Sequence, residues 1–312
     1  MDINKLLEHY QVNYSKKVFM TKLFHSTHNA YLMYIYDYPN ELENFADTFL
    51  KYLPFYVRNS DCLDVIDESA DIDIQLVERS KNIRKKSQII PKRNVASDGI
   101  YGELFLDFYL RIVNAKKAVI TYANKRSFSS NYETTGPDNV VYYLDNNEKM
   151  NICLCEAKFV KGASKAKNEL ITDIIGKPNT PGKQDGKPAH ISRDYLNDYF
   201  QFIVEKGNDI EEPDKTKFKK FFTDLNAQLD AGNDFVSVLQ SHDICVNFIF
   251  FAIFDSKKRE PNKLEEYYNE IYSQCQTNIH NIGLTNYKIE IVFIPTENST
   301  MDIKNAMEKS YE

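Results

Sequence analysis

Three charged residues stand where the surrounding sequence is otherwise apolar. Asp138 follows a Gly-Pro pair and precedes the β-branched and aromatic run 140–144, whereas Glu156 and Lys158 lie inside the apolar run 151–160. Both runs have the composition of β-strands, and a short polar turn separates them. Side chains alternate between the two faces of a strand, so Glu156 and Lys158 are expected on one face. The pattern therefore predicts that two acids and a lysine meet at neighbouring strand ends.

Charges at such positions indicate a specific chemistry. Burying a charge is costly unless it pairs with another charge or binds a metal, and divalent cations such as Mg²⁺ prefer carboxylate oxygens. The three residues thus predict a divalent-metal site. An acid-x-Lys triplet is weak evidence alone, because 255–257 and 302–304 also match it, but neither lies in an apolar strand after a Gly-Pro-Asp entry. The alternative that stays open is a surface hairpin with a cross-strand ion pair.

The spacing of these residues resembles the signature of the PD-(D/E)xK nuclease superfamily. Pro137 and Asp138 are followed, after 17 residues, by Glu156, Ala157 and Lys158. The resemblance implies that Asp138 and Glu156 bind Mg²⁺ or Mn²⁺, with the Ala157 carbonyl as a third ligand. It also implies that Lys158 positions or helps to deprotonate the attacking water. A bound cation of this kind stabilises a hydroxide nucleophile and the charge on the phosphate.

A helix is predicted at 97–113, and nearly all of its side chains are apolar. The charged exceptions Glu103, Asp107 and Arg111 are spaced four residues apart and form one narrow stripe. The superfamily has an αβββαβ core whose first helix often carries a glutamate that reaches the metal, so the resemblance implies a catalytic and metal-binding role for Glu103. Asp107 is expected to pair with Arg111 one turn later. An exposed stripe on a surface helix is the alternative for Glu103.

The elements that must position these residues follow from periodicity, which predicts an α/β fold with a mixed β-sheet flanked by helices. Strands are expected at 118–123, 140–144, 152–159, 244–254 and 287–294, and further helices at 162–175, 215–229 and 262–281. We expect the superfamily-like nuclease domain to occupy residues 91–312.

Residues 1–90 are predicted to form a small α+β region with a possible partner-binding role. Helices are expected at 2–10 and 40–56 and strands at 18–23 and 30–36. The alternation at 72–76 predicts an edge strand. The basic stretch 79–93 is polar, aperiodic and rich in Lys and Arg, which predicts a loop and a domain boundary. Two interpretations of this stretch remain. It contacts DNA phosphates or a partner protein, or it is a simple linker.

Composition favours an intracellular globular protein. The formal net charge is −6, but residues 79–127 hold twelve Lys and Arg against three Asp and Glu, so a local phosphate-binding surface is possible on an acidic molecule. The five cysteines lack the spacing of a disulfide framework, which fits a reducing cytoplasm. Cys153 and Cys155 are expected in the core, on the face opposite Glu156. No apolar run is long enough to cross a membrane.

Beyond the superfamily, the chain resembles the nuclease subunit (HamA-like) of Hachiman-type anti-phage defence systems. The residues that carry this likeness are Asp98-Gly99-Ile100-Tyr101-Gly102-Glu103-Leu104, Glu133-Thr134-Thr135-Gly136-Pro137-Asp138 and Cys155-Glu156-Ala157-Lys158-Phe159. The resemblance implies a Mg²⁺-dependent DNase that acts on DNA together with a superfamily-2 helicase (HamB-like), which restrains it. No phosphate loop of the Walker type is present, so a motor must be a separate protein. A catalytically silent subunit that binds DNA or the helicase, and a nuclease of restriction or repair, remain alternatives.

Overall fold

The computed structural model describes residues 3–18, 21–28, 31–37, 42–57, 66–86, 99–113, 119–123, 139–145, 147–175, 214–256 and 261–310. Seven strands of this part form one sheet: β1 (Thr21–His28), β2 (Tyr31–Asp37), β3 (Val119–Ala123), β4 (Asn139–Leu144), β5 (Met150–Val160), β6 (Cys245–Asp255) and β7 (Tyr287–Thr296). The helices are α1 (Ile3–Val18), α2 (Leu42–Val57), α4 (Ile72–Lys86), α5 (Gly99–Phe108) with a π-helical extension (Tyr109–Val113), α6 (Ala163–Ile175), α8 (Asp214–Asp230), α9 (Phe235–Ser241), α10 (Pro261–Asn281) and α11 (Thr300–Ser310).

The sheet is mixed, as predicted, and its spatial order is β1-β2-β7-β6-β5-β4-β3. The four central strands β2, β7, β6 and β5 are parallel, and the strands outside them, β1 at one edge and β4 and β3 at the other, pair antiparallel. Parallel strands are usually covered on both faces and read as continuous apolar runs. The almost uninterrupted burial of β6 and its predicted span at 244–254 both follow from this central position.

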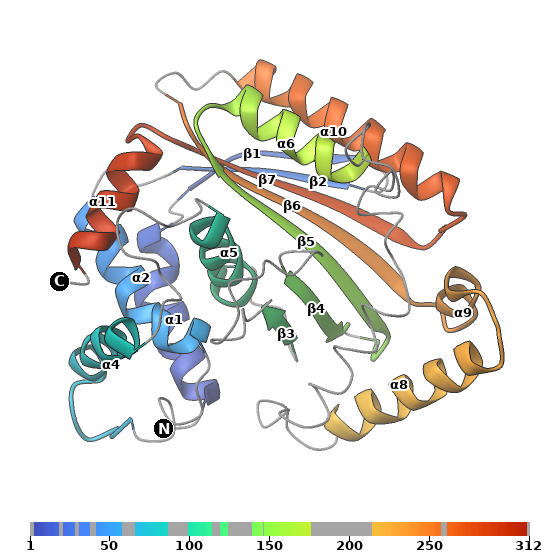
Figure 1. The fold of residues 1–312 in the computed structure, drawn as a ribbon, viewed down its shortest axis with the longest axis horizontal. Coiled ribbons are helices and arrows are strands. Elements are labelled where there is room, and N and C mark those ends of the chain that lie inside the picture. Colours follow the sequence, from blue (N-terminus) through green and yellow to red (C-terminus); the bar gives the residue numbers. More distant parts are fainter. Residues whose placement is uncertain are drawn as a thin grey trace.

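Two layers of helices cover the sheet (Figure 1). One face packs against α1, α2, α4, α5 and α11, and the other against α6, α8, α9 and α10. The odd-numbered residues of β5, including Cys153 and Cys155, face the first layer, whereas Ile152 and Val160 face the second. Both cysteines are buried in the core, as expected. None of the described helices is long and apolar enough to cross a lipid bilayer.

The predicted edge strand at 72–76 is wrong, because these residues begin helix α4. Asp71 caps the helix: its Oδ1 accepts hydrogen bonds from the backbone N–H groups of Asp73 at 2.9 Å and of Ile74 at 3.2 Å. Burial follows the helical period, since Leu76 is buried while Ile74 is 59 % exposed. The alternation of apolar and polar residues was thus a coincidence. Five positions are too few to distinguish the two-residue period of a strand from the 3.6-residue period of a helix.

The predicted loop at 79–93 is wrong over its first half. Residues 79–86 complete α4, and residues 87–93 lie outside the described part of the chain. Ser80 and Ile83 on this segment are buried, and the Ser80 hydroxyl donates to the Leu50 carbonyl of α2. Residues 79–86 contain too few apolar side chains among the lysines and arginines to show a helical pattern in the sequence. The helix was missed for this reason.

The described residues join the two predicted regions. The hairpin β1–β2 extends the main sheet by the parallel pairing of β2 with β7. One core cluster also runs from Leu6 to Met307, through residues of α2, α5 and β5. The predicted division near residue 90 falls in the segment 87–98, outside the described residues, and stays a prediction.

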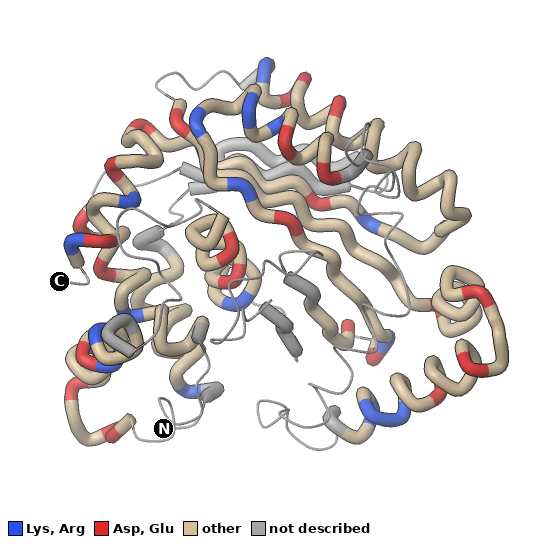
Figure 2. Tube along the Cα trace, in the orientation of Figure 1, with Lys and Arg blue, Asp and Glu red and all other residues tan. Residues whose placement is uncertain are grey.

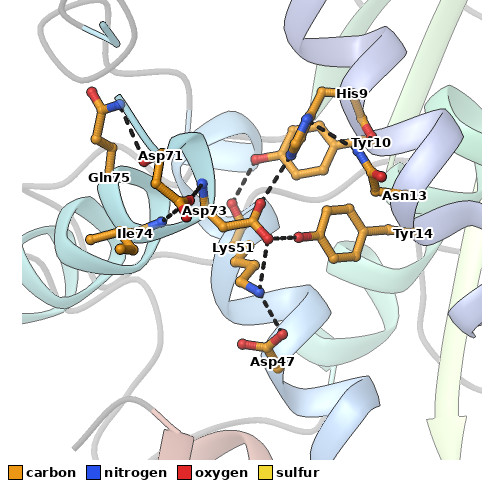
Figure 3. A network of polar contacts seen from close by, with 10 residues as sticks. All are labelled: His9, Tyr10, Asn13, Tyr14, Asp47, Lys51, Asp71, Asp73, Ile74 and Gln75. Carbon is orange, nitrogen blue, oxygen red and sulfur yellow. Dashed lines mark hydrogen bonds and ion pairs between the residues drawn. The ribbon is translucent and has the colours of Figure 1, made fainter. Parts of the chain in front are cut away.

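A polar network ties α4 to α1 and α2 (Figure 3). The Asp73 carboxylate accepts from the Tyr14 hydroxyl, lies 2.9 Å from His9 Nε2 and lies 3.2 Å from Lys51 Nζ. Lys51 also pairs with Asp47 at 2.7 Å. Partial burial alone raises the pKa of Asp73, but hydrogen bonds from Tyr14 and His9 and the charge of Lys51 together hold that pKa below its ordinary value.

The network predicts an acid-sensitive contribution to stability. Because the pKa of Asp73 is lowered on folding, its stabilising effect is present above the unfolded-state pKa of about 4 and is lost as the pH falls through the folded-state value. We expect Asp73→Asn to lower the free energy of unfolding by about 1 kcal/mol at pH 7, a modest figure because the carboxylate is partly exposed. The difference from wild type should shrink below pH 4.

Urea unfolding at pH 7 and pH 2.5 measures this difference. Asp224→Asn, on the exposed face of α8, is the matched control and should leave the stability at both values close to wild type. An equal loss for Asp73→Asn at both pH values would contradict the ionic role of the carboxylate.

Candidate functional site

Strand β5 carries the predicted acid-x-Lys pair, and the structure brings the two side chains together. Glu156 is 3 % exposed, and its Oε1 lies 2.5 Å from Lys158 Nζ. Figure 2 shows an acidic and a basic position close together on β5, among strands that are mostly uncharged. The predicted shared face is therefore confirmed, and the ammonium provides the partner that a buried carboxylate requires.

A third charged residue completes the described cluster and was missed in the sequence. Asp173 of α6 lies with its Oδ2 2.6 Å from Lys158 Nζ. Its separation of fifteen positions from Lys158, across the end of β5 and most of α6, matches no short motif. The signal available in the sequence was a carboxylate on the helix directly after the Lys strand, and such a signal is too common to single out one residue.

Helix α5 packs very closely on β5 at Gly102. A Cβ atom built there meets the Ala157 Cβ at 3.4 Å and the backbone of Lys158 and Phe159 at 3.5 Å. Because Ala157 points toward α5, this helix covers the face of β5 opposite the one that carries Glu156 and Lys158. The small residues Gly102 and Ala157 allow the helix backbone to approach the strand at this point.

Glu103 follows Gly102 and is half-buried. The Tyr56 hydroxyl of α2 donates to its Oε2 at 3.4 Å. The structure thus brings Glu156, Lys158 and Asp173 together on one side of β5, and it carries Glu103 on the helix at the other side. A metal-binding role for Glu103 stays a prediction from the resemblance.

The predicted pairing of Asp107 with Arg111 is confirmed, and it lies in the core. Arg111 Nε lies 3.0 Å from Asp107 Oδ1, and both side chains are nearly inaccessible. The Tyr52 hydroxyl donates to Asp107 Oδ2 at 2.6 Å, and the Arg111 guanidinium lies 5.2 Å from the centre of the Phe55 ring. The charged stripe of α5 is therefore covered by α2.

Asp138 lies outside the described residues, directly before β4. The ladder between β4 and β5 is described as far as the pair Asn139 and Cys155, which are the chain neighbours of Asp138 and Glu156. Ala157 continues β5, with its side chain on the α5 face. The role of its carbonyl as a metal ligand stays a prediction.

The donors on the described part of the site fit a hard divalent cation only in part. Glu156 supplies a carboxylate oxygen, the ligand type that Mg²⁺ and Mn²⁺ prefer. Within the described ranges, no three acidic, His or Cys side chains stand close enough to hold a metal ion. Asp138, the other predicted carboxylate ligand, lies outside these ranges.

Comparison with known protein families gives a match over nearly the whole chain. The family model of HamA matches residues 9–310, from within α1 to the end of α11. No curated protein sequence matches the chain.

Proposed function

From its membership of the HamA family, we propose that the chain is the metal-dependent DNA nuclease of a Hachiman defence system. Membership of this family implies a subunit of such a system. The observation that carries the proposal is the pair of buried Glu156 and partly buried Lys158 on β5, with the carboxylate and the ammonium 2.5 Å apart. An acid and a lysine two positions apart on a central strand are uncommon in a core, because each loses its hydration there.

The arrangement of elements around this pair supports the proposal. Helix α5, the meander β3-β4-β5, helix α6 and the parallel strand β6 occur along the chain in the αβββαβ order of the PD-(D/E)xK nucleases, with α8 and α9 between α6 and β6. Asn139 pairs with Cys155 in the antiparallel ladder. The proposal requires the same register to continue by one residue, which pairs Asp138 with Glu156 and sets both carboxylates on one face.

Asp138, Glu156 and the carbonyl of Ala157 are the proposed ligands of Mg²⁺ or Mn²⁺. Such a cation, when bound, stabilises the nucleophile and the negative charge on the phosphate. Lys158 shares the face of Glu156, so its ammonium can orient the attacking water and contact the phosphate. Glu103, proposed from the resemblance alone, is a further ligand to be tested by substitution.

The proposed partners are DNA and a superfamily-2 helicase. A DNase of low sequence specificity harms its own cell, so its activity must be withheld until it is needed. The basic residues from Arg79 onward, which the structure places in part on α4, are a proposed contact for DNA phosphates or for an acidic surface of the helicase.

Plasmid degradation by the purified chain, alone and with its helicase, tests the proposed function. We expect cleavage with Mg²⁺ or Mn²⁺, none with EDTA, and recovery when excess Mg²⁺ is added. The helicase should suppress cleavage until its own DNA trigger is supplied. Cleavage that persists in EDTA would contradict the metal, and absence of cleavage under every condition would favour the silent DNA- or helicase-binding subunit.

A further inference from the structure

The ammonium group of Lys158 lies between two carboxylates that come from different elements. Its Nζ is 2.5 Å from Glu156 Oε1 on β5 and 2.6 Å from Asp173 Oδ2 on α6. The Lys158 side chain is only 18 % exposed, so water replaces these contacts poorly. One lysine thus connects the central strand of the site to the helix that covers it.

This arrangement has a consequence for a cation that binds Glu156. The ammonium and a divalent cation are both positive and compete for the same carboxylate oxygen. A lysine that depended on Glu156 alone would either resist the cation or be driven away from the site by it. A second carboxylate removes this conflict, because it holds the ammonium while Glu156 binds the metal.

We propose that Asp173 is a positioning residue of the site, which retains the Lys158 ammonium beside the substrate when a divalent cation engages Glu156. The inference rests on the proposed function and adds a residue to it. Asp173 acts through Lys158, and no contact of its own with DNA or metal is required.

Helix α6 is well fixed for this task. Its residues Ala166 and Leu170 are fully buried against the sheet, and Lys167 pairs with Glu270 of α10 at 2.6 Å. Asp173 lies one turn after Leu170 on this anchored helix and is about one-third exposed. The distance between its carboxylate and β5 is therefore set by packing that does not depend on the bound cation.

Binding of Mn²⁺ to the full-length protein gives a test that does not use activity. Titration calorimetry should show that Asp173→Asn weakens Mn²⁺ binding about fivefold or more, because Lys158 then competes harder for Glu156. Lys158→Met should remove that competition. In the Lys158→Met background, the Asp173→Asn change should then alter the affinity less than twofold. An equal weakening in both backgrounds would show a general effect of charge and overturn the proposal.

DNA cleavage by the same variants gives a second test of the role of Asp173. Asp173→Asn should lower kcat on the order of tenfold to a hundredfold with little change in KM, and Asp173→Glu should recover part of the loss. The matched control is Glu169→Gln, on the same helix, whose carboxylate pairs with Lys165 at 3.6 Å and should be replaceable without effect.

The outcomes separate this inference from the proposed function. Wild-type protein that neither binds Mn²⁺ nor cleaves DNA would reject both. Wild-type protein that does both, with Asp173→Asn indistinguishable from it, would reject the role of Asp173 and leave the nuclease assignment standing. Thermal unfolding of each variant shows whether a lost signal reflects a lost fold.

Discussion

Glu156→Gln is expected to reduce metal-dependent DNA cleavage by roughly a hundredfold or more while the protein stays folded. The substitution keeps the shape of a side chain that is 3 % exposed and removes only its negative charge. A neutral amide is a poor ligand for Mg²⁺, and it no longer balances the ammonium of Lys158 at 2.5 Å. Both effects act on the proposed site at once. Cleavage of plasmid DNA under single-turnover conditions measures the loss.

Asp302→Asn is the matched control for this experiment. Asp302 begins an acid-x-Lys triplet with the same spacing, but it lies in the first turn of α11, where its carboxylate accepts from the Ser299 hydroxyl at 2.7 Å. We expect the Asp302→Asn variant to cleave DNA at the wild-type rate. Near wild-type cleavage by Glu156→Gln, with Mn²⁺ affinity unchanged, would remove the basis of the proposed site.

The second large effect concerns stability. Asp107→Ala is expected to lower the free energy of unfolding by roughly 3–5 kcal/mol, because it leaves the Arg111 guanidinium buried without its carboxylate. The Tyr52 hydroxyl also loses its acceptor. Guanidinium chloride unfolding followed by circular dichroism measures the change.

Two further variants separate the buried pair from an ordinary ion pair. Replacing both partners, with Asp107→Leu and Arg111→Met together, should cost clearly less than Asp107→Ala alone, because no uncompensated charge remains. Glu68→Ala breaks the exposed pair with Lys5, 3.0 Å apart, and should cost no more than about 1 kcal/mol. A similar cost for Glu68→Ala and Asp107→Ala would contradict the role of burial.

The parts of the fold that were predictable from sequence are those with a strong and local pattern. The continuous apolar run of β6 and the periodic patterns of the amphipathic helix α10 and the strand β5 each extend over ten or more residues. Helix α5 was predictable because almost every position is apolar while its three charges keep a helical spacing. Local patterns of this length leave little room for a competing structure.

What could not be predicted depends on distant contacts. Asp173 enters the site because α6 folds back over β5, and the pairing of Asp173 with Lys158 leaves no trace in either local sequence. Helix α4 was mistaken for a strand because its first residues alternate, while the contacts that decide its structure come from His9, Tyr14 and Lys51 on other helices. Tertiary contacts of this kind outweigh short-range preference.

The pairing of β2 with β7 affects the order in which the protein can fold during synthesis. Each residue in this ladder lies 258 positions from its partner, as with Tyr31 and Ile289. Strand β2 therefore cannot pair with β7 until nearly all of these residues have left the ribosome. The nascent hairpin presents an exposed edge that can pair with other strands. Production of this protein should accordingly depend on chaperones or slow expression more than its final compact sheet suggests.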